Sequence, residues 1–179
     1  LVELGYLRRR YPLADGKRAA RQIRFALEDP LLRFWFRFVF PNRSSLAQLG
    51  PEKSFHQLVK PHLDSFFGGC FESLCRQALA SLYERQNVTA AYEVGEFWDK
   101  QTQIDVVGLR SDDWTDLGEC KWGAPPSLPR LAADLGDKVK RYPNHRNATI
   151  GLHLFLRNRP AKERLSGITI HDLEELYEF

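Results

Sequence analysis

The segment that decides the fold is QIDVV at residues 103–107, followed by DLGECKW at residues 116–122. The first segment alternates around Asp105 and the second carries Glu119 and Lys121 two residues apart, which predicts two strands that can pair as a hairpin. Side chains two residues apart on a strand point to the same face, so we expect Glu119 and Lys121 side by side, with Asp105 within reach across the hairpin. Two carboxylates and one ammonium on an apolar sheet are unfavourable unless a cation or a reaction uses them.

The elements around this hairpin predict an α/β (α+β) fold, a mixed central sheet with helices packed on it. From Glu72 onward the expected order is helix, three strands, helix, two strands and a closing helix that Asp172 caps. The flanking elements are a helix whose apolar stripe starts at Phe71, a strand at 90–97, a helix at about 131–141, strands at 149–156 and 168–170, and a helix at 173–177. His153, within the apolar strand, is either a ligand or, as we favour, a core histidine with a satisfied hydrogen bond.

The first 28 residues have a different character. Residues 1–5 are typical of the last turn of a helix that Gly5 stops, and residues 6–13 and 22–27 predict two strands joined by a turn at 14–17. A helix end followed by a basic two-stranded ribbon resembles the final part of a winged-helix domain. Its arginines would then contact phosphates, although a remnant that only packs against a neighbouring domain fits equally well. These arginines are Arg8, Arg9, Arg10 and Arg18.

Residues 29–60 are expected to bridge the two parts of the chain. Residues 31–40 are apolar almost all round, which predicts a buried bridging helix, and residues 41–51 predict a turn-rich link before a short helix at 52–58. Gly68 and Gly69 are expected to end a loop, which would place Glu72 in the first turn of the helix that follows.

Composition limits the function classes. Residues 1–60 hold 12 Lys and Arg against 5 Asp and Glu, whereas residues 61–179 hold 14 against 18, so the basic first part is either a surface for nucleic acid or an acidic partner or, equally well, a solvated basic face. No apolar run reaches the ~18 residues of a membrane span, and no glycine-rich phosphate loop is present. The three cysteines have no metal-like spacing and fit reduced thiols in a cytoplasmic protein. The chain starts at Leu1 and lacks Met, so we expect it to be a fragment of something longer.

The charged residues of the hairpin suit one chemistry in particular. Asp105 and Glu119, with the backbone carbonyl of Cys120, are oxygen ligands for Mg²⁺ or Mn²⁺. Such a metal polarises a phosphate and acidifies a water, and Lys121 on the same face would orient that water or offset developing charge. Glu72 would support the site from the preceding helix.

Asp105, the Glu119-Cys120-Lys121 tripeptide and the helical Glu72 together resemble the PD-(D/E)XK nuclease superfamily, whose restriction-endonuclease-like core has the same element order. Ile104 stands where that motif has Pro. On a wider scale, LGYL at 4–7, EDPLLRFWFRF at 28–38 and GECKW at 118–122 make the chain similar to the C-terminal half of the archaeal-type AAA ATPases.

The wider resemblance implies the end of a winged helix at 1–28, a bridge at 29–60 and a nuclease-like domain at 61–179. ATP binding would belong to an upstream ATPase domain of the same polypeptide. Three hypotheses follow: a Mg²⁺-dependent nuclease acting on DNA, a catalytically inactive module that binds DNA or protein for the ATPase, and a functionless ion pair of Glu119 with Lys121. We rank the last lowest because it leaves Asp105 unexplained.

Overall fold

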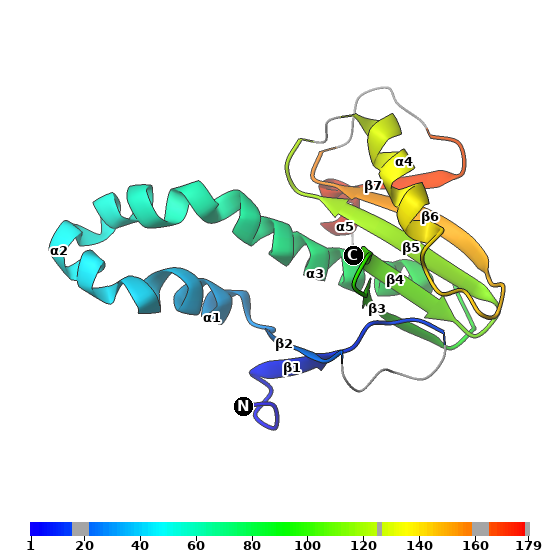
Figure 1. The fold of residues 1–179 in the computed structure, drawn as a ribbon, viewed down its shortest axis with the longest axis horizontal. Helices are drawn as coiled ribbons and strands as arrows, with labels where there is room; N and C mark the ends of the chain where they lie inside the picture. The colour runs from blue at the N-terminus through cyan, green and yellow to red at the C-terminus, as the bar shows by residue number, and fades with distance from the viewer. Residues whose placement is uncertain (16–21, 125–126, 159–164, 178–179) are drawn as a thin grey trace.

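A five-stranded mixed sheet forms the body of the protein in the computed structural model, which describes residues 1–15, 22–124, 127–158 and 165–177 (Figure 1). The strands lie in the order β3-β4-β5-β6-β7; the first three are antiparallel neighbours, and β6 and β7 continue the sheet in parallel. Their bounds are β3 (Tyr92–Trp98), β4 (Gln103–Arg110), β5 (Trp114–Lys121), β6 (Thr149–Leu156) and β7 (Ile168–Asp172). The predicted α+β class, the predicted element order and the hairpin of β4 and β5 are confirmed.

Helices cover both faces of this sheet. Helix α3 (Leu63–Arg85) lies on one face, where its apolar stripe packs against side chains of β4, β5 and β6. Helix α4 (Leu128–Val139) covers the other face (Figure 1). It begins at Ser127, whose hydroxyl accepts the N–H of Arg130. The short closing helix α5 (Leu173–Tyr177) follows β7, and Asp172 caps it as predicted by accepting the N–H of Glu175.

A small hairpin precedes the body. Strands β1 (Leu7–Arg10) and β2 (Arg24–Leu27) pair antiparallel, as the sequence predicted, whereas Arg18 and part of the predicted turn lie outside the described residues. Before β1, Gly5 adopts φ +75°, its N–H donates to Val2, and the Tyr6 N–H donates to Leu1. These two hydrogen bonds have the pattern of a Schellman motif, as expected for Gly5, but residues 1–5 form a turn and no helix precedes it among the described residues.

The segment after β1 attaches the hairpin to the body. Pro12 forms a parallel bridge with Glu96 of the edge strand β3, and the Leu13 N–H donates to the Glu96 carbonyl at 2.7 Å. The Leu13 side chain is buried in the same cluster as Ile104 and Val107. The hairpin is therefore held against the sheet edge by backbone bonding and by apolar burial.

Between the hairpin and the body, the chain forms an elongated helical arm (Figure 1). It runs out through α1 (Pro30–Phe34), η1 (Trp35–Val39) and η2 (Phe40–Asn42). Helix α2 (Arg43–Ser54) turns back at Gly50, which has φ +75° and precedes Pro51. The arm returns through η3 (Phe55–Val59), η4 (Lys60–His62) and the first turns of α3. Glycine followed by proline is typical of one helix ending and the next beginning.

Two prolines within the arm do not stop its helices, contrary to the link predicted at 41–51. A π-helical turn precedes each proline: η1 lies before Pro41 and η3 before Pro61, and each proline lies in a 3₁₀ turn. A proline ring clashes with the carbonyl four residues earlier in an α-helix. A widened π turn moves that carbonyl away, so the helical path continues.

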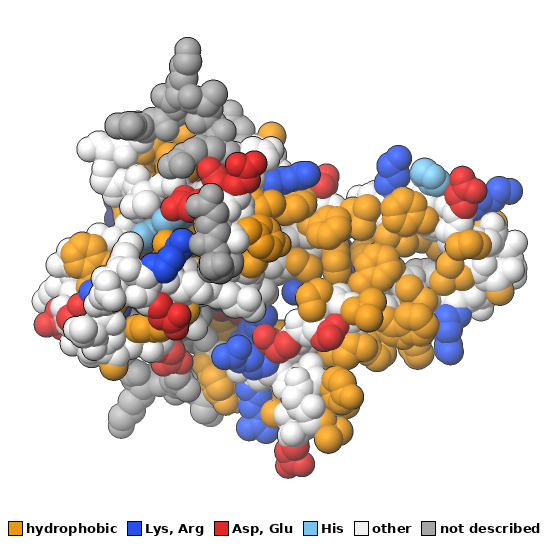
Figure 2. Space-filling view, turned by 180° about the vertical axis from the view of Figure 1, so that it is seen from behind, with side chains coloured by type: hydrophobic (Ala, Val, Ile, Leu, Met, Phe, Trp, Pro, Cys, Tyr) orange, Lys and Arg blue, Asp and Glu red, His pale blue; other side chains and the backbone are white. Residues whose placement is uncertain are grey.

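The predicted burial of residues 31–40 is wrong. Leu31 is 73% exposed and Phe36 52% exposed, and in this segment only Phe38 is buried. Phe38 packs against Phe66 on the returning helix. A broad hydrophobic surface consequently covers the arm (Figure 2). Among the described helices, none combines the length and apolarity that a membrane crossing needs.

The loop predicted to end at Gly68 and Gly69 is also wrong, because α3 runs through both residues. A side chain at Gly69 would meet the guanidinium of Arg33 from α1 at 2.8 Å, and Arg33 donates to the Gly69 carbonyl. The absence of a side chain at Gly69 therefore lets Arg33 approach the backbone of α3 closely. Glu72 lies well inside the helix instead of in its first turn.

Candidate active site

A bulge in β4 determines where Asp105 lies. The register of β3 and β4 pairs Gly95 with Val107 but Phe97 with Ile104, so β4 has one extra residue between these two pairs. Asp105 lies within this irregularity. A β-bulge bends its strand and turns a side chain away from the position that regular alternation gives it. The alternating pattern of the sequence could not show this displacement.

The carboxylate of Asp105 replaces a strand partner for β5. The backbone pairing of β4 with β5 ends at Val106 and Gly118. Immediately beyond, Oδ2 of Asp105 accepts the backbone N–H of Cys120 at 3.0 Å. The side chain is 8% exposed and is fixed directly beside the Glu119-Cys120-Lys121 tripeptide. The predicted approach of Asp105 to this strand is therefore observed.

Two lysines hold the carboxylate of Glu119. The ammonium of Lys121 donates to Oε1 at 3.2 Å, which confirms that the two side chains lie side by side. The ammonium of Lys138, from the last turn of α4, donates to Oε2. Glu119 is only 5% exposed, so these contacts compensate a charge that is otherwise removed from water.

Helix α3 contributes two more charged side chains from consecutive turns. Arg76 lies four residues after Glu72 and donates to the backbone carbonyl of Asp105 at 2.8 Å. It also approaches Glu96 of β3 at 3.8 Å, and Arg10 of the small hairpin pairs with the same Glu96 at 3.2 Å. A continuous set of ionic contacts thus joins β1 to the candidate site.

The carboxylates perturb one another. Burial, followed by the charges of Glu119 and Glu72, raises the pKa of Asp105 to about 7. Burial is also the largest cause of the raised pKa of Glu72, to which Glu96 and Glu119 add. Burial by itself would lower the pKa of Lys121, but the charge and hydrogen bond of Glu119 outweigh it and raise that pKa. The raised pKa values of Asp105 and Glu72 therefore follow first from burial and then from the mutual repulsion of the carboxylates, and a cation bound beside them would lower both pKa values.

The oxygen atoms at this site provide some, but not all, of the ligands that a hard divalent cation needs. Asp105 and Glu119 supply carboxylate oxygens on neighbouring strands, and Asp105 uses only Oδ2 for Cys120. Within the described residues, no three His, Cys, Asp or Glu side chains come together as a complete metal site. Mg²⁺ commonly takes one or two carboxylates and completes its shell with waters and substrate oxygens. This set of ligands therefore suits Mg²⁺ better than a metal that takes all of its ligands from the protein.

The sequence anticipated most of the site but missed three residues. Lys138 contacts Glu119 and Arg76 contacts Asp105 directly, whereas Glu96 reaches the site through Arg76. The spacing of Arg76 from Glu72 could have indicated a shared helix face. No local pattern could have placed Lys138 or Glu96, because their positions depend on how α4 and the edge strand dock.

The thiol of Cys120 plays no part on this face. It packs in the apolar cluster under α3 together with Cys75. Burial, followed by the neighbouring Cys75, raises its pKa well above the usual thiol range. Only the backbone of Cys120 is thus available to the candidate site.

A second polar cluster lies toward the other end of β5 and surrounds Asp116. Oδ1 of Asp116 accepts the indole N–H of Trp114 at 2.8 Å and the Nε2–H of His153 at 2.9 Å, and Oδ2 accepts the Tyr83 hydroxyl. Nδ1 of His153 lies 3.0 Å from Nε2 of His171. Both ring nitrogens of His153 have partners, so the expectation of a satisfied core histidine is confirmed.

The fold and the site define an α+β domain with a five-stranded mixed sheet and a buried carboxylate–lysine cluster. The family model described as "Archaea bacterial proteins of unknown function" (DUF234) matches residues 35–130, more than half of the chain. The chain belongs to this family.

One relative extends the comparison. The chain is 24% identical over 126 residues to a protein of Methanocaldococcus jannaschii called "Uncharacterized protein MJECL04". The match covers 68% of this chain but 27% of that protein, so the chain spans about a quarter of its relative's length.

Proposed function

We propose that residues 61–179 form a Mg²⁺-dependent nuclease domain that hydrolyses phosphodiester bonds of DNA. The observation that carries this proposal is the position of Asp105, which a bulge brings beside the Glu119–Lys121 pair. Bulges are frequent next to active sites, and a buried aspartate with a raised pKa is typical of functional positions.

Each side chain has a role in this proposal. Asp105 and Glu119 would bind the metal together with the Cys120 carbonyl, and Mn²⁺ could replace Mg²⁺. When bound, the metal polarises the scissile phosphate and lowers the pKa of a water. Lys121 would orient the attacking water and stabilise the charge that develops on the phosphate. Glu72 would accept hydrogen bonds from waters in the outer shell.

We further propose that this domain works with an ATPase domain in a longer polypeptide. The support is the resemblance of the chain to the C-terminal half of the archaeal-type AAA ATPases, together with the greater length of the Methanocaldococcus jannaschii relative. ATP would then bind only to the ATPase part, and β1 and β2 would belong to the end of a winged helix.

The nuclease proposal is tested by incubating the protein with plasmid, linear and single-stranded DNA in Mg²⁺, Mn²⁺ or EDTA. Metal-dependent cleavage is expected in the wild type. Asp105→Ala and Lys121→Ala should each slow it at least about a hundredfold, as is usual for groups that act in the transition state. Lys140→Ala is a suitable control, because Lys140 directly follows α4 and, among the described residues, forms its ion pair with the exposed Asp137. Cleavage that persists in the first two variants would reject the assignment.

A second candidate is an inactive nuclease-like module that binds DNA or a partner protein for the ATPase. The observation in its favour is that lysines already occupy both carboxylate oxygens of Glu119. A metal would have to displace one of them. This candidate predicts no metal-stimulated cleavage and DNA binding that survives Asp105→Ala.

A further inference from the structure

A cavity of about 380 Å³ lies between the β1–β2 hairpin, α3 and β3. Four arginines line it, Arg8, Arg9, Arg10 and Arg76, with the carboxylates of Glu28, Glu93 and Glu96. The charged groups of the lining therefore leave a net positive charge. Figure 2 shows Lys and Arg side chains gathered where the hairpin meets the body.

The arginines of the cavity differ in how firmly they are held. Arg10 and Arg76 both approach Glu96, so this carboxylate and its two partners form a fixed base. Arg9 is exposed and forms no ion pair with another described residue; its guanidinium lies 6.0 Å from the ring of Phe25. Arg8 is mostly exposed and only approaches Glu28, at 3.7 Å. Exposed pairs of this kind contribute little, so Arg8 is available to an anion on the Glu28 side of β1. Arg9 is the next residue of the strand and points to the opposite face, where it is available to a neighbouring part of the same polyanion.

The cavity also adjoins the candidate active site. Arg76 lines the cavity and donates to the backbone carbonyl of Asp105. Ser73 and Gln77, next to it on α3, line the same space. An anion bound here would lie one side chain away from the carboxylates that are proposed to bind the metal.

We propose that this cavity and the ribbon beside it bind backbone phosphates of a DNA strand next to the cleaved bond, with Arg8 as a ligand on the Glu28 side of β1, Arg9 as a ligand on the opposite face of β1 and Arg76 fixing the base of the cavity. This inference rests on the proposed function and adds the surface that holds the substrate. Guanidinium groups match phosphate in a planar, bidentate geometry. The exposed arginines of β1 extend beyond the cavity, which favours a continuous polyanion over a small phosphate ligand. The positive cavity also offsets the acidic character of the body, which would otherwise repel DNA.

DNA binding is measured without cleavage, by fluorescence anisotropy of single-stranded and duplex oligonucleotides in EDTA at several KCl concentrations. Arg8→Gln/Arg9→Gln should weaken binding about tenfold or more and reduce the slope of log K against log salt by about 1 to 2. Arg130→Gln/Lys140→Gln removes the same charge from α4, on the other face of the sheet, and should leave the slope unchanged. A double hairpin variant that binds with wild-type affinity and slope overturns the proposal.

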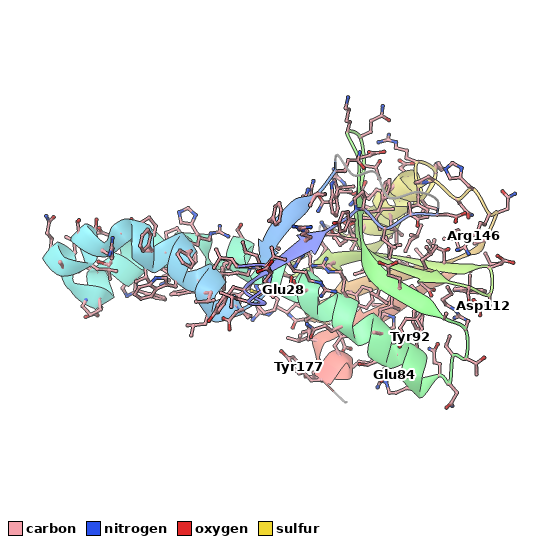
Figure 3. The ribbon with its side chains drawn as sticks, turned by 90° about the horizontal axis from the view of Figure 1, so that it is seen from below. Glu28, Glu84, Tyr92, Asp112, Arg146 and Tyr177 are labelled. Atoms are coloured by element: carbon pink, nitrogen blue, oxygen red, sulfur yellow. The ribbon has the colours of Figure 1, made fainter. Side chains whose placement is uncertain are left out.

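Three further measurements test the proposal independently. Glu28 lies where the hairpin passes into the arm (Figure 3) and pairs with Arg8 and Arg10, so Glu28→Gln should tighten DNA binding severalfold. Unchanged or weaker binding contradicts the proposal. Tripolyphosphate tests a small ligand: if it binds with the same dependence on Arg8 and Arg9 while oligonucleotides do not bind, the DNA assignment fails. Asp105→Asn should abolish cleavage but keep the dependence of DNA binding on Arg8 and Arg9, which separates this surface from the nuclease proposal.

Discussion

Lys138 of α4 and Glu119 of β5 form an ion pair across the connection between the sheet and the helix that covers it. Glu119 thereby has a lysine at each oxygen, because Lys121 occupies the other one. Lys121 lies two residues from Glu119 on the same strand, so the period of the strand alone places the two side chains together. Lys138 depends on the docking of α4, so it acts as a separate counter-ion that a divalent metal would replace.

We therefore expect Lys138→Gln to increase the affinity for Mn²⁺ at least about fivefold, equivalent to ~1 kcal/mol, because the metal no longer competes with this ammonium. The same change should lower stability in EDTA, since it leaves Glu119 with one cation fewer. Calorimetric titration with Mn²⁺ and urea unfolding measure the two effects. Lys140→Gln, two residues further along the chain, should change neither. Weaker Mn²⁺ binding by Lys138→Gln would instead show that this lysine belongs to the binding-competent site.

The raised pKa of Asp105 predicts a pH dependence of folding. Its folded pKa of about 7 exceeds the ordinary value of 3.8, so the folded state binds this proton more tightly than the unfolded state. The contribution of Asp105 to stability is then fully present below about pH 4 and is lost as the pH rises toward about 7, with a slope of at most ~1.4 kcal/mol per pH unit.

Asp105→Asn removes this titration and should flatten the pH dependence between 4 and 7 while it stabilises the protein at pH 8. Urea unfolding in EDTA across this range measures both effects. Asp137→Asn, at an exposed position on α4, should retain the wild-type slope. If the stability curves of the wild type and Asp105→Asn stay parallel from pH 4 to 8, the pKa of Asp105 is not raised in the folded protein.

Features that follow from local sequence were predicted correctly, whereas features that depend on how strands and helices dock were not. Strand β6 was predicted at its observed bounds, because an uninterrupted apolar run is a local property. The pairing of Glu119 with Lys121 followed from the two-residue period of a strand. The bulge at Asp105 and the arrival of Lys138 depend on how strands and helices dock, so no pattern within β4 or α4 could reveal them.

In the arm, the predictions were wrong for another reason. The usual local meanings of proline, glycine and an apolar run do not hold there. Pro41 and Pro61 indicated helix ends, yet π-helical turns accommodate both rings. Gly68 and Gly69 indicated a loop, yet both lie inside α3, and Gly69 allows the close approach of Arg33. Residues 31–40 have the composition of a buried helix, but burial needs a surface to pack against, and the described residues offer one mainly to Phe38.

The polar cluster around Asp116 is expected to contribute strongly to stability. Burial alone would raise the pKa of Asp116, but hydrogen bonds from His153, Tyr83 and Trp114 outweigh it and lower that pKa. His153→Phe removes one donor from a buried carboxylate and should cost about 2–4 kcal/mol in urea unfolding. His145→Phe, at an exposed position, is the matched control and should change stability by less than about 0.5 kcal/mol. A loss below 1 kcal/mol in the first variant would mean that water replaces the imidazole.

Two glycines provide a final matched test, because added methyl groups would meet very different neighbours. At Gly108 a Cβ would lie 2.0 Å from the Tyr83 hydroxyl oxygen and 2.9 Å from a methyl of Leu79. Tyr83 could move only by losing its hydrogen bond to Asp116, so Gly108→Ala should destabilise the protein by about 2–4 kcal/mol.

At Gly69 the Cβ would meet only the end of the flexible Arg33 side chain, and alanine favours a helix over glycine by about 1 kcal/mol. Gly69→Ala should therefore be neutral or slightly stabilising in the same urea unfolding experiment. Equal losses in the two variants would contradict the close packing of α3 against β4, which also holds Glu72 and Arg76 beside Asp105.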